Sequence, residues 1–156
     1  MTRQATGLVV RKAISVRASR EQAFAVFTEQ IGTWWPLEGK SIGAVPAQAA
    51  VLEPRSGGRW YERGVDGSEC DWGRVLAYEP PARVLLDWQI SADWRYDSSL
   101  HTEVEVRFVA EDATRTRVEL EHRGLEAFGD DAEPLFAIFD SPDGWASILE
   151  RFSATV

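Results

Sequence analysis

The sequence predicts an α+β domain, with a curved antiparallel sheet of about six or seven strands around a long C-terminal helix and two short helices after the first strand. Three observations support this prediction. Strand-like stretches separated by turn residues fill the middle of the chain, two of them alternate strictly between apolar and polar residues, and an apolar stripe at helical spacing closes the chain. With 156 residues, 44% of them apolar, residues 1–156 are expected to form a single domain.

The first elements are expected to be a strand and a capped helix. Residues Leu8–Val16 have the apolar content of a strand. Ser19 follows as a candidate N-cap, and Gln22 stands three residues later, which is the spacing of a capping box. A second short helix over Thr28–Trp34 is expected to end before Pro36, because proline disfavours the helical conformation in the residue that precedes it.

Turn residues divide the middle of the chain into short strands. A loop rich in glycine and small residues spans 37–47, and the predicted strands are 49–52, 59–63, 70–78 and 84–91. The inward face of the Cys70–Tyr78 strand stays undecided, because both of its faces carry apolar side chains. The competing sets are Trp72, Leu76 and Tyr78 on one face and Gly73, Val75 and Ala77 on the other. A β-bulge within this strand would switch the inward face part of the way along.

The next two strands alternate clearly. Residues 102–108 and 116–122 each place apolar side chains on one face and charged ones on the other. By this alternation His122 shares a face with Val118 and Leu120 and is expected to point inward, whereas His101 points outward. The inward face of these strands should therefore form one wall of the core.

The C-terminal part contains an irregular stretch and a helix. Residues 124–140 mix phenylalanine and leucine with glycine, aspartate and proline and give no clear pattern. Ser141-Pro142-Asp143 has the composition of a helix start, with an N-cap, a proline in the first turn and an acidic residue at the positive end of the helix dipole. The stripe that follows consists of Trp145, Ile148, Leu149 and Phe152.

Composition excludes several classes of function. The chain has 25 acidic and 17 basic residues, a formal charge of −8, and no basic stripe, so neither nucleic acid nor an anionic membrane surface is an expected partner. Cys70 is the only cysteine, which rules out an internal disulfide and fits a reducing compartment. Met1–Gly7 lacks the layout of a signal peptide, and no apolar run has a membrane-spanning length of about 20 residues. We expect a cytoplasmic protein, either a monomer or a homodimer.

Motifs for cofactors, metals and catalysis are missing. The glycines stand in turn contexts rather than in a phosphate-binding loop, and no paired histidines, paired cysteines or tight aspartate cluster provide metal ligands. Asp130-Asp131 with Glu133 is expected to be a solvated acidic loop. No nucleophile elbow occurs, and Cys70 has no neighbouring base. The sequence therefore predicts no cofactor, no metal and no established catalytic residue.

The order of elements and a series of short motifs resemble a known group of proteins. These motifs are Val26-Phe27, Trp34-Trp35-Pro36, Leu52-Glu53-Pro54, Gly57-Gly58-Arg59-Trp60, Gly73 to Pro81, Leu86-Asp87-Trp88, Thr102-Glu103-Val104, Thr116 to Leu120, and Gly144-Trp145 leading to Phe152. Together they resemble the START/SRPBCC superfamily, which includes polyketide cyclases, and within it the bacterial family named after the heat-shock protein 90 ATPase activator domain. The resemblance implies a helix-grip fold with a hydrophobic cavity between the sheet and the long helix.

Aromatic side chains are the main candidates for lining such a cavity. Their rings suit planar apolar ligands, although large rings serve equally often as plain core. The candidate ligand-binding residues are Trp35, Trp60, Glu62, Trp72, Trp88, His122, Trp145 and Phe152. Of these, His122 and Glu62 would supply polar contacts, unless His122 is a hydrogen-bonded structural residue and Glu62 belongs to a solvated hairpin end.

Three functions remain open at this point. The first is binding of a small hydrophobic molecule between the sheet and a helix over Ser141–Thr155, without catalysis. The second is an enzyme of the cyclase, aromatase or hydrolase kind that uses His122, Glu62 or Asp71 as acid–base groups. The third is a stress-related, co-chaperone-like module that binds a protein partner through an exposed apolar patch between Phe128 and Phe139.

Overall fold

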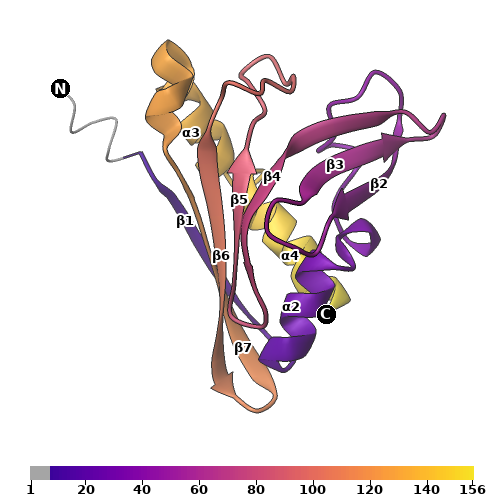
Figure 1. Ribbon diagram of the computed structural model, residues 1–156. Helices are drawn as coiled ribbons and strands as arrows, with labels where there is room; N and C mark the ends of the chain where they lie inside the picture. The colour runs from indigo at the N-terminus through magenta and orange to yellow at the C-terminus, as the bar shows by residue number, and fades with distance from the viewer. Residues whose placement is uncertain (1–7) are drawn as a thin grey trace.

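Seven antiparallel strands form a single curled sheet in the order β1-β7-β6-β5-β4-β3-β2 (Figure 1). This computed structural model describes residues 8–156, and Met1–Gly7, which is not expected to be a signal peptide, lies outside them. The strands are β1 (Val10–Val16), β2 (Ala47–Leu52), β3 (Arg59–Gly64), β4 (Glu69–Glu79), β5 (Arg83–Trp88), β6 (Thr102–Asp112) and β7 (Arg115–Arg123). The helices are α2 (Arg20–Thr28), the 3-10 helices η1 (Ile31–Thr33) and η2 (Leu125–Asp131), α3 (Ala132–Asp140) and α4 (Trp145–Thr155).

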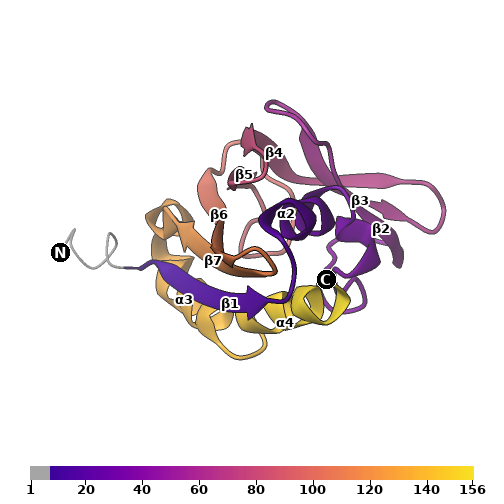
Figure 2. The ribbon, with the colours of Figure 1, turned by 90° about the horizontal axis from the view of Figure 1, so that it is seen from below.

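The sheet curls around α2 and α4, and the core lies between them (Figure 2). This arrangement is the helix-grip α+β fold expected from the sequence. The largest fully buried side chains are Trp34, Trp60, Trp72, Trp145, Phe27, Phe108 and Phe152. Among residues 8–156, no helix has the length and hydropathy needed to cross a membrane.

The start of α2 confirms the predicted cap. The Ser19 hydroxyl oxygen accepts a hydrogen bond from the Gln22 amide at 3.1 Å, which satisfies one of the free N–H groups of the first turn. After α2, the predicted second helix is only the single turn of η1, which ends before Trp34 and Trp35. The Trp34 indole donates a hydrogen bond to the Val26 carbonyl at 2.9 Å and thereby fixes this turn against α2.

Strand β4 changes its inward face along its length, because β-bulges interrupt it, as expected from the sequence. Its register with β3 shifts opposite Trp60 and Tyr61, and its register with β5 shifts between Val75 and Ala77. As a result Trp72 and Val75 are both buried although they are three residues apart. At the first shift Gly73 lies so close to β5 that any side chain there would collide with the Asp87 carbonyl.

The predicted start of the last helix was wrong by several residues. Ser141 ends α3 instead of capping α4, because its hydroxyl donates back to the Ile138 carbonyl at 2.7 Å. The helix α4 begins only at Trp145, after a tight reversal in which Gly144 packs against the Phe139 carbonyl with no room for a Cβ atom. The irregular stretch before it is largely helical, since it forms η2 and α3.

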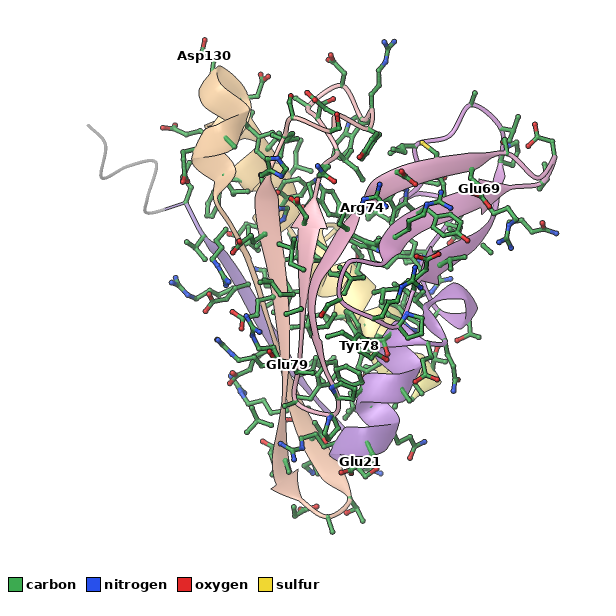
Figure 3. All side chains as sticks on the ribbon, in the orientation of Figure 1. Glu21, Glu69, Arg74, Tyr78, Glu79 and Asp130 are labelled. Atoms are coloured by element: carbon green, nitrogen blue, oxygen red, sulfur yellow. The ribbon has the colours of Figure 1, made fainter. Side chains whose placement is uncertain are left out.

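The segment proposed as an exposed patch buries most of its large apolar side chains. Phe128, Leu135 and Phe139 are at most 9% exposed, and Ile138 is the exposed large apolar residue of this segment. In contrast, Asp130 is exposed at the outer end of the molecule (Figure 3), and the acidic residues expected to form a loop there belong to η2 and the start of α3. The three buried side chains are therefore part of the core and are not available to a protein partner.

The convex face of the sheet carries a network of arginines and glutamates. At its centre, Glu105 of β6 is only 7% exposed and contacts Arg83, Arg123 at 2.8 Å and Arg107 at 3.3 Å. Burial alone would raise the pKa of Glu105, but hydrogen bonds from Arg83 and Arg123 outweigh it, and the pKa lies below its ordinary value. The stability that this pairing contributes is therefore present above the ordinary glutamate pKa and is lost as the pH falls through the lowered value.

Replacing Glu105 with Gln is expected to destabilise the protein by about 1–3 kcal/mol at neutral pH, because three arginines lose their common carboxylate. The midpoint of urea unfolding measures this change. The control is Glu119→Gln, since Glu119 pairs with Arg107 and Arg117 on the exposed rim and should change stability by less than about 0.5 kcal/mol. Equal effects of the two substitutions would contradict a special role for the central carboxylate.

Candidate functional site

An aromatic pocket of about 570 Å³ opens at one end of the sheet. Its lining residues come from the loop before β2, from β4 and β5, from the β5–β6 connection, and from α3, the α3–α4 junction and the start of α4. Its lining residues are Trp35, Gly39, Lys40, Ser41, Ile42, Gly43, Trp72, Trp88, Ile90, Asp93, Trp94, Arg95, Ile138, Phe139, Gly144, Trp145 and Ile148. This volume lies within the range of pockets that hold small organic ligands.

Four tryptophans that the sequence singled out form the buried part of the pocket wall. They are Trp35, Trp72, Trp88 and Trp145, each at most 6% exposed. Their rings contact one another: the centroid distance is 5.1 Å from Trp35 to Trp72 and 5.5 Å from Trp88 to Trp145. They come from four elements, namely the turn after η1, the bulged strand β4, the end of β5 and the first residue of α4. The fold thus gathers aromatic residues that are distant in sequence.

Two other predicted residues lie behind this wall rather than in it. Trp60 is 1% exposed and packs against Trp72 and Trp88, with ring centroids 5.4 and 5.8 Å away. Phe152 is fully buried between Phe27 and Trp34. Neither lines the pocket, so both are core residues that support it from behind.

Glu62 is buried and holds the loop that forms one side of the pocket. Its carboxylate accepts hydrogen bonds from the Ile42 amide at 2.7 Å, the Gly43 amide at 3.0 Å and the Trp72 indole at 2.8 Å. No lysine or arginine of residues 8–156 forms an ion pair with it. Glu62 does not line the pocket itself but fixes three residues that do.

His122 is a buried structural histidine. Its Nδ1 accepts a hydrogen bond from the Trp145 indole at 3.1 Å, and its Nε2 lies 2.9 Å from the Thr102 hydroxyl, which donates to the Trp88 carbonyl at 3.0 Å. These contacts suit the neutral ring with its proton on Nε2. Burial lowers the pKa of His122 to about 3, so the ring is neutral at physiological pH. The prediction that it points inward is confirmed, but it lies outside the pocket lining.

The acid–base residues proposed for an enzyme do not meet at one point. Asp71 pairs with Arg59 at 2.7 Å, Glu62 and His122 are buried, and none of the three lines the pocket. Burial, with the nearby negative charges of Glu62 and Asp71, raises the pKa of the Cys70 thiol, which makes it a poor nucleophile. No cluster of metal-ligating side chains occurs among residues 8–156.

Polar groups at the mouth of the pocket come from two loops that were not predicted to belong to the site. Lys40 and Ser41 precede β2, and Asp93 and Arg95 flank Trp94 in the β5–β6 connection. Lys40 is positioned through its carbonyl, which accepts a hydrogen bond from the Trp35 indole at 2.9 Å. Asp93-Trp94-Arg95, an aromatic residue between two charged ones, is the feature of the sequence that could have indicated a binding loop. The sequence alone does not reveal which loop reaches the pocket.

Comparisons with known proteins agree with the fold and give a family. A family model described as "Activator of Hsp90 ATPase homolog 1-like protein" matches residues 17–156. Among solved structures, an anthrahydroquino-gamma-pyrone synthase, Txn09, is 37% identical, with 95% of this chain and 96% of that chain covered and a TM-score of 0.66. The self-sacrificing resistance protein CalC from Micromonospora echinospora is 30% identical, with coverage of 94% and 92% and a TM-score of 0.69.

A more distant structure shares only the fold. Protein MLL2253 from Mesorhizobium loti is 17% identical over 94% of both chains, with a TM-score of 0.66. No curated protein sequence matches the chain.

Proposed function

We propose that this chain, which belongs to the family of Activator of Hsp90 ATPase homolog 1-like proteins, binds a planar aromatic small molecule in its tryptophan-lined pocket. The observation that carries the proposal is the pocket itself, whose wall contains Trp35, Trp72, Trp88 and Trp145. Aromatic walls give flat rings both apolar burial and favourable edge-to-face contacts. The identity of 37% to an anthrahydroquino-gamma-pyrone synthase supports a small molecule rather than a protein as the partner.

The test is a thermal-shift titration with 1,8-dihydroxyanthraquinone as the probe. At a concentration about 100 times the dissociation constant, binding stabilises the native state by about 2.7 kcal/mol, which corresponds to a rise in melting temperature of about 5–10 °C. The variant Ile138→Glu places a charge on the exposed edge of the pocket and is expected to weaken binding at least about tenfold. No shift with this probe or with a panel of similar planar compounds would overturn the proposal.

A matched control exists for the pocket variant. Val109 of β6 is 45% exposed, close to the 47% of Ile138, but it lies away from the pocket. The variant Val109→Glu is expected to bind the probe like the wild type. If both variants lose binding equally, the loss comes from general destabilisation and not from a change in the pocket.

The second candidate function is ring closure on a bound aromatic substrate. It is favoured by the identity of 37% to a synthase and by Asp93, the only carboxylate that lines the pocket within residues 8–156. A suitable test reaction is the closure of 1-(2-hydroxyphenyl)butane-1,3-dione to 2-methylchromone. In this reaction the phenol oxygen adds to the distal carbonyl carbon, and one water molecule leaves.

The absorbance of the chromone measures the rate. Catalysis above buffer that falls about tenfold or more in Asp93→Asn would support an enzyme. Tight binding of the probe with no acceleration of this reaction would favour the binding function.

A further inference from the structure

We infer that Trp94 selects planar aromatic ligands over aliphatic ones, because its indole stacks on the face of a ligand ring at the pocket mouth. This inference rests on the proposed function, since it needs a ligand in the pocket. Three observations about Trp94 carry it: the conformation of its backbone, the exposure of its side chain, and its position on the pocket wall.

The backbone of Trp94 has a conformation that bulky residues rarely adopt. Its φ of 59° lies in the left-handed region, and it is the only non-glycine residue with positive φ among residues 8–156. Glycine occupies this region without steric cost, whereas a Cβ atom and a large side chain are disfavoured there. Residues held in such conformations cluster at ligand-binding and active sites, where the surrounding structure maintains them.

Hydrogen bonds of the surrounding turn hold Trp94 in place. The Ser91 amide donates to the Arg95 carbonyl at 2.8 Å, and the Trp94 amide donates to the Ser91 carbonyl at 2.9 Å. Just outside this turn, Ile90 and Tyr96 form an antiparallel bridge. Backbone hydrogen bonds within the turn therefore fix its conformation. The turn, and not packing in the core, determines where the indole of Trp94 lies.

The Trp94 side chain is only partly buried by the protein itself. Trp94 is 43% exposed, while the other six tryptophans are buried. Its one contact with another aromatic ring among residues 8–156 is with Phe139, at a centroid distance of 6.4 Å and an interplanar angle of 84°. Both Trp94 and Phe139 line the pocket, so a flat ligand in the mouth would cover the exposed indole face.

This arrangement favours one class of ligand. A flat ring offers its whole face to the indole, whereas a flexible aliphatic chain offers a narrow contact and loses more conformational freedom on binding. The inference therefore concerns the ratio of the two affinities rather than either one alone. In this respect Trp94 differs from the four buried tryptophans, which any apolar ligand would contact.

The experiment compares two ligands on three variants by isothermal titration. In the wild type, 1,8-dihydroxyanthraquinone should bind more tightly than decanoate. In Trp94→Gly this preference should fall at least about tenfold, and in Trp94→Phe it should be largely kept, since a ring remains. The control Leu76→Thr, at a residue that is also 43% exposed but lies outside the pocket, should keep the full preference.

The stability of Trp94→Gly provides an independent readout. Glycine relieves the left-handed backbone, so the melting temperature without ligand should stay unchanged or rise by up to about 4 °C. A lower melting temperature with an unchanged preference would show that Trp94 merely packs on Phe139 and would overturn the inference.

The two proposals fail in different ways. If the wild type and Trp94→Gly both bind 1,8-dihydroxyanthraquinone and prefer it over decanoate to the same degree, the role of Trp94 is overturned but the binding function stands. If neither ligand binds the wild type, both proposals fall.

Discussion

Lowering the pH from 6.5 to 4.5 is expected to cost the native protein about 2.3 kcal/mol through His122 alone. Burial lowers the pKa of this histidine from 6.5 to about 3, so the unfolded chain takes up a proton in this range and the native state does not. The stability contributed by the neutral ring is fully present above pH 6.5 and is lost progressively as the pH falls toward 3. Urea unfolding at several pH values measures the slope, which approaches about 1.4 kcal/mol per pH unit below about pH 5.5.

The two histidines of the chain provide the variant and its control. His122→Gln can still accept from Trp145 and donate to Thr102, but it has no titrating ring, so the slope between pH 6.5 and 4.5 should disappear. His101 lies on the convex face with 66% of its side chain exposed, and His101→Gln should keep the slope. A slope that survives in His122→Gln would contradict the assignment to this buried ring.

The substitution Glu62→Ala is expected to destabilise the protein by about 2–4 kcal/mol, because the buried Trp72 indole and the partly buried amides of Ile42 and Gly43 lose their acceptor. Glu62→Gln should cost less, about 1–3 kcal/mol, since its oxygen can still accept while its NH₂ group faces one of the donors. In Glu62→Ala, the amide hydrogens of Ile42 and Gly43 should exchange with solvent much faster than in the wild type, as measured by hydrogen exchange. Ligand binding should weaken as well, because both residues form part of the pocket wall.

A glutamate on the neighbouring strand serves as the control for Glu62. Glu69 of β4 is exposed and forms an ion pair with Arg59 at 2.9 Å on the outer side of the sheet (Figure 3). Glu69→Gln should change stability by less than about 0.5 kcal/mol and leave the exchange of the Ile42 amide unaffected. Protected Ile42 and Gly43 amides in Glu62→Ala would contradict the role of Glu62 in holding the loop.

Local patterns in the sequence were enough to predict most of the fold. The Ser19 cap and the alternation in β6 and β7 involve neighbouring residues only, and the structure confirms them. The start of α4 was mispredicted because Ser141, Pro142 and Asp143 have helix-start composition but occupy a turn. That turn depends on the close approach of Gly144 to α3, which is a tertiary contact.

The site was harder to predict, since a pocket is defined by contacts between distant segments. The aromatic character of its wall was visible in the sequence, yet Trp60 and Trp88 look alike there, and only the packed fold separates the residue behind the wall from the one within it. The same holds for Glu62, whose two amide donors lie in a loop about twenty residues earlier in the chain. The backbone conformation of Trp94 has no signature in the sequence, because the residue type argues against it.

The cluster of tryptophan rings also gives the molecule an optical property. Six indoles form a continuous series, with neighbouring centroids 5.1–6.2 Å apart, and Trp94 stands outside it. At such spacings an excited indole passes its energy to its neighbours before it emits light. A molecule that quenches one of these rings is therefore expected to lower the emission of its neighbours as well, so the unlabelled protein should report by its own fluorescence whether the pocket is occupied.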